Sequence, residues 1–426
     1  MAHKGRAERS DILVVGGGLT GLPLALALRG GALHDGNEDS GLSVGVISKE
    51  GPDDLLAPER DGRAFALSAS SRNLLQLLGV WEHVADKAQP MTMIDITDSK
   101  LEEVLRPSLL HMDNEMESGE PAAYVVEAHI LRGALARVYA KRDDIKIISP
   151  ADVTGFEVHS GSVDVQLASG KHHRSRLLVA SDGRSSDLRA IAGIKTVDWP
   201  ASQWGIVATI AHANPHNGRA VQHFLPAGPF AVLPLTDNRV SLVWSEQRDF
   251  ASKVTRMDDE DFLHEVRLRM GSALVDQLGD LSLAGPRNAY PLTMLVARDY
   301  VKERFALVGD AAHGMHWIAG QGLNYGLRDV AALAQTLIEA HRLGLDIGSL
   351  SQLQRYEQWR RFDSFAFTAG MVVLNQLFSN DNMILRPLRD FGLNVAGHLP
   401  FAKKLFTTEA AGLSGDVPKM LKGEVV

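Results

Sequence analysis

The chain has 426 residues, of which 45% are hydrophobic and 23% charged, a composition typical of a globular protein large enough for more than one domain. Its net charge of -8 argues against a general nucleic-acid surface, and we expect no nucleic-acid partner. The absence of cysteine excludes disulfides, thiolate metal sites and thiol catalysis, so any redox chemistry requires a bound cofactor. We assign no metal ligands, and a reducing, cytoplasmic location fits.

The N-terminal part has the pattern of a βαβ unit. Residues 11–15 form a short apolar run typical of a buried parallel strand, and the apolar run 22–28 predicts a helix packed on the sheet. After a turn-rich loop, residues 44–47 predict the second strand. Further along the chain we predict helices over 72–84 and 126–140, two strands within 145–168 and a buried strand over 175–180.

From residue 203 to 246 the pattern changes to alternating runs, which predict an antiparallel sheet in a separate layer. Residues 257–279 read as helical, 304–309 as a buried strand and 321–342 as a helix, and the last 75 residues are mostly amphipathic helix. The strand at 304–309 resembles those of the first unit but lies almost 300 residues away. The simplest arrangement is therefore one domain made from both ends of the chain, with a sheet domain inserted.

A glycine-rich segment, Gly16-Gly17-Gly18-Leu19-Thr20-Gly21, joins the first strand to its helix and matches G-x-G-x-x-G. Gly16 allows a tight turn, Gly18 lets the backbone approach a pyrophosphate, and Gly21 lets helix and strand pack closely. The phosphates would lie at the helix N-terminus, where free N–H groups favour anions. The alternative is a turn without a ligand, but the position between strand and helix favours dinucleotide binding.

The second strand normally ends in an acid that binds a ribose hydroxyl. Here the strand is followed by Ser48, with Glu50 two positions further on. Either Glu50 binds the ribose from a shifted position or Ser48 makes a weaker contact.

Two further segments carry polar residues at strand ends. The strand over 175–180 is followed by Ser181-Asp182-Gly183, with Ser186 and Arg189 on the next turn; alone, Asp-Gly is usually only a turn. The strand over 304–309 ends in Gly309-Asp310, where a carboxylate can accept hydrogen bonds from ribityl or ribose hydroxyls. Gly320 and Gly322 can bring backbone N–H groups close to a flat ring at a helix start, which a Schellman-type turn would not require.

Together these segments resemble the class A flavoprotein monooxygenases, which have the para-hydroxybenzoate hydroxylase fold. Within that class the chain is most similar to the ubiquinone-biosynthesis hydroxylase family, over residues 11 to about 418. The residues that carry the resemblance are Asp61 to Ser68 (DGRAFALS), Leu78 to Trp81 (LGVW), Gly309 to His313 (GDAAH), Ala319 to Asn324 (AGQGLN), Gly326 to Asp329 (GLRD), Leu377, Phe378, Arg386 and Gly412.

The resemblance implies an α/β fold with an FAD-binding Rossmann-like domain, an inserted antiparallel-sheet substrate domain and C-terminal helices. The expected division gives the FAD-binding domain residues 1–90, 126–195 and 296–345, the substrate domain residues 91–125 and 196–295, and the C-terminal helical region residues 346–426.

The resemblance also implies roles for individual residues. Arg63 and Arg132 would contact the FAD phosphates or ribityl region, and the alternative is that each forms a surface ion pair. The pyrophosphate and the nicotinamide donor would be supported by Asp182, Gly183 and Arg189. The ribityl chain would be held by Gly309 and Asp310, and the isoalloxazine by Gly320, Gly322, Leu323 and Asn324.

The catalytic candidates are His316, Trp317 and Gln321. The family usually carries a proline where this chain has Trp317, and a tryptophan there would stack on the flavin or substrate, or narrow the oxygen pocket. His313 and His316 are candidates for proton traffic or ring contact, and a structural role is an equal alternative. Phe230, Leu233 and Trp244 of the inserted sheet are either walls of the substrate site or, the safer interpretation, core.

The implied activity is hydroxylation of a polyprenylated phenol by a flavin C4a-hydroperoxide, with FAD as cofactor, O2 as co-substrate and NAD(P)H or ferredoxin as reductant. The insoluble substrate suggests a quinone-biosynthesis complex or contact with the inner membrane, for which the apolar stripe within Phe365 to Phe406 is a candidate, although such stripes are more often core. Three alternatives are another flavoenzyme of this fold, a non-catalytic flavoprotein subunit and, less favoured, a nicotinamide-only dehydrogenase.

Overall fold

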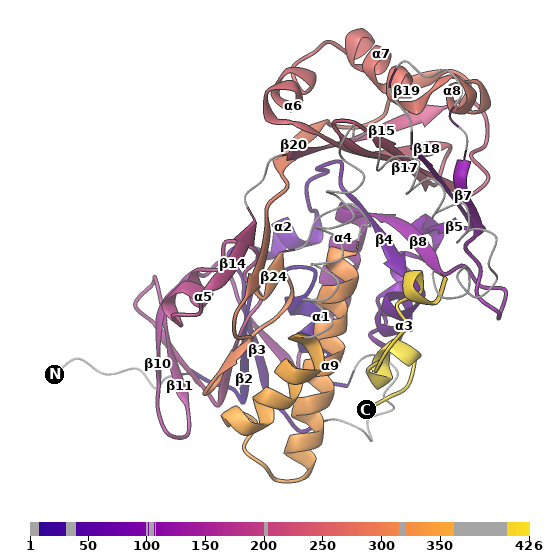
Figure 1. The fold of residues 1–426 in the computed structure, drawn as a ribbon. Helices are drawn as coiled ribbons and strands as arrows, with labels where there is room; N and C mark the ends of the chain where they lie inside the picture. Colours follow the sequence, from indigo (N-terminus) through magenta and orange to yellow (C-terminus); the bar gives the residue numbers. More distant parts are fainter. Residues whose placement is uncertain are drawn as a thin grey trace.

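The computed structural model describes residues 8–30, 40–98, 101, 106, 108–199, 203–314, 321–361 and 407–426. The predicted stripe within 365–406 therefore lies outside the described residues. Two large sheets lie one above the other in Figure 1, with the long helix α9 (Gly322–Arg342) running below the upper sheet.

The lower sheet has six strands drawn from five distant parts of the chain. In spatial order they are β22 (Val301–Lys302), β23 (Phe305–Leu307), β13 (Leu177–Ala180), β2 (Ile12–Val15), β3 (Val44–Ile47) and β9 (Ile145–Ile148). All pairs are parallel except β22 with β23. The strand near residue 305 thus pairs within the sheet of the N-terminal βαβ unit, whereas the exact domain boundaries stay a prediction.

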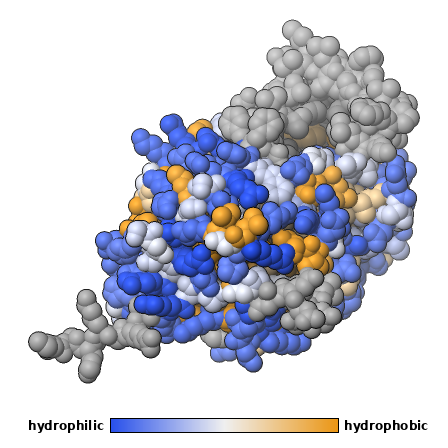
Figure 2. Space-filling view, turned by 90° about the horizontal axis from the view of Figure 1, so that it is seen from below, coloured by the Kyte–Doolittle hydropathy of each residue, from blue (hydrophilic) through white to orange (hydrophobic). Residues whose placement is uncertain are grey.

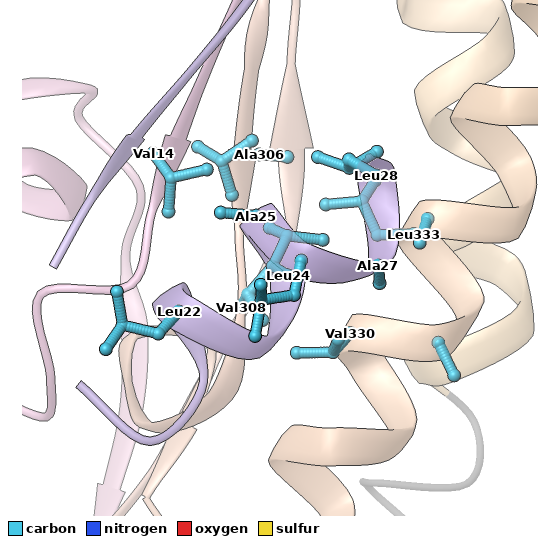
Figure 3. Close-up of a cluster of buried hydrophobic side chains, with 14 of the residues drawn as sticks. Val14, Leu22, Leu24, Ala25, Ala27, Leu28, Ala306, Val308, Val330 and Leu333 are labelled. Atoms are coloured by element: carbon cyan, nitrogen blue, oxygen red, sulfur yellow. The ribbon is translucent and has the colours of Figure 1, made fainter. Parts of the chain in front are cut away.

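Helix α1 (Gly21–Leu28) is buried at every residue because it lies between this sheet and α9. Figure 3 shows Val14, Ala306 and Val308 of the sheet region on one side of α1, and Val330 and Leu333 of α9 on the other. A helix covered on two sides needs apolar residues all round, which explains why the run 22–28 lacks a polar face.

The upper sheet has seven strands in one path, β19 (Leu281–Leu283), β15 (Gln203–His212), β18 (Arg239–Gln247), β17 (Gly228–Leu235), β16 (Arg219–Leu225), β6 (Met93–Asp98) and β7 (Ser108–Asp113), and β20 (Asn288–Pro291) pairs with β15 as the eighth. Its far face is covered by α6 (Arg248–Val254), α7 (Asp259–Met270) and α8 (Ser272–Leu278) (Figure 1). Phe230 and Trp244 belong to the hydrophobic cluster under these helices, whereas Leu233 packs in a separate cluster on the opposite face.

The described residues also form three smaller sheets. They consist of β4 (Ala64–Ser68), β8 (Ala123–Glu127) and β5 (Gln89–Met91); β1 (Glu8–Arg9), β12 (His172–Ser175), β11 (Val163–Leu167) and β10 (Val153–Val158); and β14 (Thr196–Trp199), β21 (Met294–Ala297) and β24 (His313–Gly314). The remaining described helices and helical turns are α2 (Pro52–Leu56), α4 (Ala128–Tyr139), α5 (Asp187–Ile191), η3 (Gly309–Ala311) and η5 (Lys419–Lys422).

Two predicted elements were wrong, and a third is divided in two. The helix expected over 72–84 is α3 (Ala69–Leu77), which ends before Gly79 adopts a φ of +70° and gives way to two 3-10 turns, η1 (Trp81–His83) and η2 (Ala85–Lys87). The stretch 145–168 holds three strands, not two, and the first joins a different sheet from the others. The helical region 257–279 is divided at Gly271, whose φ is +79°.

Seen from below, the surface is mostly hydrophilic, with hydrophobic residues in several separate groups (Figure 2). Leu343 and Leu345, just after α9, are among the exposed hydrophobic side chains. Within the ranges given above, no helix is both long and apolar enough to cross a bilayer.

Candidate functional site

The three segments predicted to hold a cofactor meet at the side chain of Thr20. Its hydroxyl lies 2.7 Å from the hydroxyl of Ser181, the residue that follows β13. A Cβ atom added to Gly309 or Gly326 would lie 2.9 or 2.7 Å from the Thr20 methyl carbon, closer than real Cβ contacts allow. The glycine-rich turn, the Asp-Gly segment and the Gly-Asp segment are therefore packed directly against one another.

The glycines of the first segment differ in how much space their surroundings leave for a side chain. A Cβ on Gly16, whose φ is +119°, would lie 2.1 Å from the Ser181 carbonyl oxygen, and one on Gly21 would lie 1.8 Å from the Gly16 carbonyl oxygen. A Cβ on Gly18 would have no described atom within 4 Å, and the same holds for Gly183 and Gly322. The protein's own packing thus requires Gly16 and Gly21, whereas the space beside Gly18 is open, as the predicted approach of a pyrophosphate needs.

Two helices begin in this region without a side-chain cap. Thr20 is the residue before α1 and Gln321 the residue before α9, and neither side chain accepts a hydrogen bond from a backbone N–H of its helix. The first turns of both helices also lack acidic residues. Uncapped N-terminal N–H groups favour anionic or polar ligand atoms, as the phosphates and the flavin ring would provide.

Asp182, in the second of these segments, has one buried carboxylate oxygen without a hydrogen-bond partner among the described residues. One carboxylate oxygen accepts a hydrogen bond from the Leu188 N–H at 3.3 Å, while Oδ1 is buried and has no partner among the described residues. A buried carboxylate oxygen without a donor is costly, so a hydroxyl or amide of a bound cofactor fits there.

Arg189 joins two of the segments. Its guanidinium donates to the carbonyl oxygens of Ala311 at 2.8 Å and Arg184 at 2.9 Å, and burial lowers its pKa. Arg184 lies 3.6 Å from Asp310, whose side chain is 45% exposed and so remains accessible to a ligand. Arg189 thus braces the turn at 309–311 rather than presenting a free cation.

Asp329 is the buried anchor of the Gly-Asp turn. Its carboxylate accepts hydrogen bonds from the Gly309 N–H at 3.0 Å, His313 Nε2 at 2.5 Å and Arg360 Nε at 2.8 Å. Burial alone would raise the pKa of Asp329, but the charges and hydrogen bonds of His313 and Arg360 hold it below its usual value. His313 has no exposed side-chain surface, which supports its structural interpretation over proton traffic.

Asn324 fixes the start of α9 to β4. Its side-chain oxygen accepts from the Ser68 N–H and the Ser71 hydroxyl, and its amide nitrogen donates to the Ala66 carbonyl oxygen and to Gln321 Oε1. Both ends of the amide are satisfied, so a cofactor at this position would meet the backbone of Asn324 rather than its side chain.

Comparison with known proteins agrees with this arrangement. A family model described as an FAD binding domain matches residues 9–362. The chain is 40% identical to the ubiquinone hydroxylase UbiL of Rhodospirillum rubrum, over 98% of this chain and 94% of that protein. It belongs to the FAD-dependent monooxygenases of the ubiquinone-biosynthesis hydroxylase family.

Two other known proteins are also similar to this flavoprotein monooxygenase. The 3-demethoxyubiquinol 3-hydroxylase of Escherichia coli is 31% identical, over 95% of this chain and 99% of that protein. The crystal structure of p-nitrophenol 4-monooxygenase from Pseudomonas putida superposes with a TM-score of 0.75 at 18% identity, covering 96% of this chain and 99% of that chain. This second likeness establishes the fold alone, which is the fold expected from the sequence.

Three predicted FAD ligands form ion pairs within the monooxygenase. Arg132 pairs with Glu50 at 2.5 Å, and Arg63 pairs with Asp61 at 2.6 Å, 6.0 Å from the centre of the Tyr290 ring. Glu50 is 47% exposed, whereas Ser48 is buried beneath Gly17. Of the two residues considered for the ribose, Glu50 is therefore the accessible one, and the FAD contacts of all three stay predictions.

The other predicted residues divide into two groups. His316, Trp317 and Gly320 lie outside the described residues, and Gln321 and Leu323 stand at the start of α9, with Leu323 buried in the core. A surface cavity of about 680 Å³ is lined by other residues, Ile191 and Leu350 among them. None of the predicted site residues lines this cavity.

Sequence reasoning assigned no role to Thr20, Arg184, Asp329 or Arg360. Thr20 and Asp329 stand inside motifs that were recognised, so their positions were available but their contacts were not. Arg360 lies in an ordinary amphipathic pattern, and no sequence signal marks it as the fully buried partner of Asp329.

Proposed function

We propose that this monooxygenase hydroxylates the aromatic ring of a polyprenylated phenol, a precursor in ubiquinone biosynthesis. The substrate class rests on nearly full-length likeness to the ubiquinone hydroxylase of Rhodospirillum rubrum and the 3-demethoxyubiquinol hydroxylase of Escherichia coli. The convergence of three segments on Thr20 is the structural observation that carries the cofactor part of the proposal.

Bound FAD, reduced by NAD(P)H or ferredoxin, supplies activation of O2, of which one atom enters the ring and the other leaves as water. The protein's share is to hold the cofactor and to exclude water. The α1 N-terminus and Gly18 would receive the phosphates, Asp310 and Asp182 Oδ1 would accept cofactor hydroxyls, and the backbone at the α9 N-terminus would meet the ring. The segments that carry these groups are packed directly against one another, which supports the preorganisation that such a site needs.

Quinone-intermediate profiling in a strain lacking this protein tests the proposal. We expect one prenylated precursor that lacks a ring hydroxyl to accumulate. Its chemical structure would identify the ring position that this enzyme hydroxylates. Purified holoenzyme should then consume O2 faster with that precursor than with an unprenylated phenol. Turnover of soluble phenols alone would indicate another hydroxylase of this fold, and FAD binding without turnover would indicate a non-catalytic subunit.

The water-insoluble tail of such a substrate requires delivery from a membrane or from partners in a biosynthetic complex. Peripheral contact with the inner membrane is part of the proposal, with residues 365–406 as its candidate segment. Sedimentation of the full chain with anionic lipid vesicles measures this contact independently of catalysis.

A further inference from the structure

The face of the upper sheet opposite α6, α7 and α8, here called the inner face, carries one polar side chain that needs explaining. On β16, Val221 and Leu225 belong to the cluster under these helices, and His223 packs against Phe230 of the same cluster. Because side chains alternate along a strand, Gln222 points to the inner face. Ala220, two residues earlier, packs there against Met91, Ala123 and Val125, as this alternation requires.

Gln222 sits in an apolar row across the inner face. It pairs with Ile96 on β6 and Ala231 on β17, and Ala231 is followed by Val243 on β18 and Val207 on β15. Its side-chain nitrogen is buried and has no hydrogen-bond partner in the described part of the chain. A buried amide that the protein leaves unpaired destabilises the fold, unless a ligand completes it.

Strand β4 holds the inner face close to the predicted flavin site. Ala64 packs against the inner face beside Ala220 and Leu233. The carbonyl oxygen of Ala66 accepts the hydrogen bond from Asn324 at the start of α9, 2.8 Å away. Two residues of strand span about 7 Å, so β4 links the inner face to the α9 N-terminus through a short stretch of backbone.

We infer that Gln222 is a specificity-determining residue, whose amide hydrogen-bonds the ring hydroxyl of the phenolic substrate. The inference rests on the proposed function and adds the residue that recognises the phenol oxygen. A hydroxyl both donates and accepts, so either orientation of the amide can bond it. The apolar residues of the row then pack against the ring and the prenyl substituent, for which they need no specific geometry.

Ligand titration of the FAD-bound enzyme tests this directly. The probes are 2-prenylphenol and prenylbenzene, which differ only in the hydroxyl, and binding is followed by the change in flavin absorbance. We expect wild type to prefer the phenol by about tenfold, the effect of one hydrogen bond to a buried group. Gln222→Met, which keeps the length of the side chain without its amide, should bind prenylbenzene as wild type does and lose the preference for the phenol.

The control is Gln166→Met, an exposed glutamine on β11 of a different sheet, which should keep the wild-type preference. Equal weakening of both ligands in Gln222→Met would overturn the inference, because it indicates a packing role, and so would an unchanged preference. If Gln222→Met does not fold, Gln222→Asn gives the same readout, since its amide is withdrawn by one carbon and should also lose the preference. Failure of wild-type enzyme to respond to 2-prenylphenol would overturn the proposed substrate class and this inference together, whereas a wild-type response that Gln222→Met retains overturns the inference alone.

Discussion

Nε2 of His313 lies 2.5 Å from the Asp329 carboxylate, and neither side chain has any exposed surface. The same carboxylate accepts a hydrogen bond from the Gly309 N–H and pairs with the fully buried Arg360. Asp329 therefore links the Gly-Asp turn, the strand that contains His313 and the helix that contains Arg360. The position of Asp310 therefore depends on a residue that need not touch the cofactor.

Asp329→Asn should destabilise the protein strongly. Asparagine keeps the shape but removes the charge that pairs with Arg360 and His313 in the buried network. Breaking a buried pair in this way costs about 3–5 kcal/mol. Urea denaturation measures the loss. Asp259→Asn is the matched control, because Asp259 is 69% exposed and its pair with Arg287 should contribute under about 1 kcal/mol. Equal stability of the two variants would show that the buried network contributes little.

The glycine-rich turn allows a ligand effect to be separated from a folding effect. Gly18→Ala adds a methyl group where no described atom lies within 4 Å, so apoprotein stability should change by less than about 1 kcal/mol. FAD affinity should fall at least about tenfold, because the methyl group occupies the space expected for the pyrophosphate. Thermal unfolding of the apoprotein and FAD titration by fluorescence measure the two quantities.

Gly21→Ala is the comparison, since its Cβ would lie 1.8 Å from the Gly16 carbonyl oxygen and should destabilise the apoprotein itself. An unaltered FAD affinity in Gly18→Ala would remove this turn from the cofactor site.

The parallel strands and the three cofactor segments were predictable because buried strands are nearly continuous apolar runs, and their polar ends follow directly in the sequence. Contacts between segments were not predictable in the same way. Thr20 contacts Ser181 across 161 residues and Asn324 binds Ser68 across 256, and no local pattern encodes either pairing. The end of α3 was missed because Gly79 interrupts the helix only through its positive φ, while the apolar spacing continues beyond it.

Glu50→Gln tests whether this exposed acid binds the FAD ribose. Its pair with Arg132 is near the surface, so loss of the charge should lower the free energy of unfolding by at most about 1 kcal/mol. FAD affinity should fall about tenfold through loss of a charge-assisted hydrogen bond. Ser48→Ala should leave FAD affinity unchanged, because Ser48 is buried beneath Gly17. The reverse pattern would assign the ribose contact to Ser48.

His223 should make the upper sheet sensitive to mild acid. Burial, followed by the positive charges of Arg106 and Arg219, lowers the pKa of His223 to about 3, against a smaller opposing effect of the Met270 carbonyl and Asp95. The unfolded chain takes up this proton near pH 6.5 and the folded protein does not, so the stability is fully present above that pH and is lost as pH falls toward 3. Between pH 7.5 and 5 the loss is about 2 kcal/mol.

Urea denaturation at both pH values measures this loss of stability. The reference is His223→Gln, because glutamine keeps a partner for the Thr97 hydroxyl but does not titrate. Identical pH dependence of the two proteins would show that His223 is protonated in the folded state as readily as in the unfolded one.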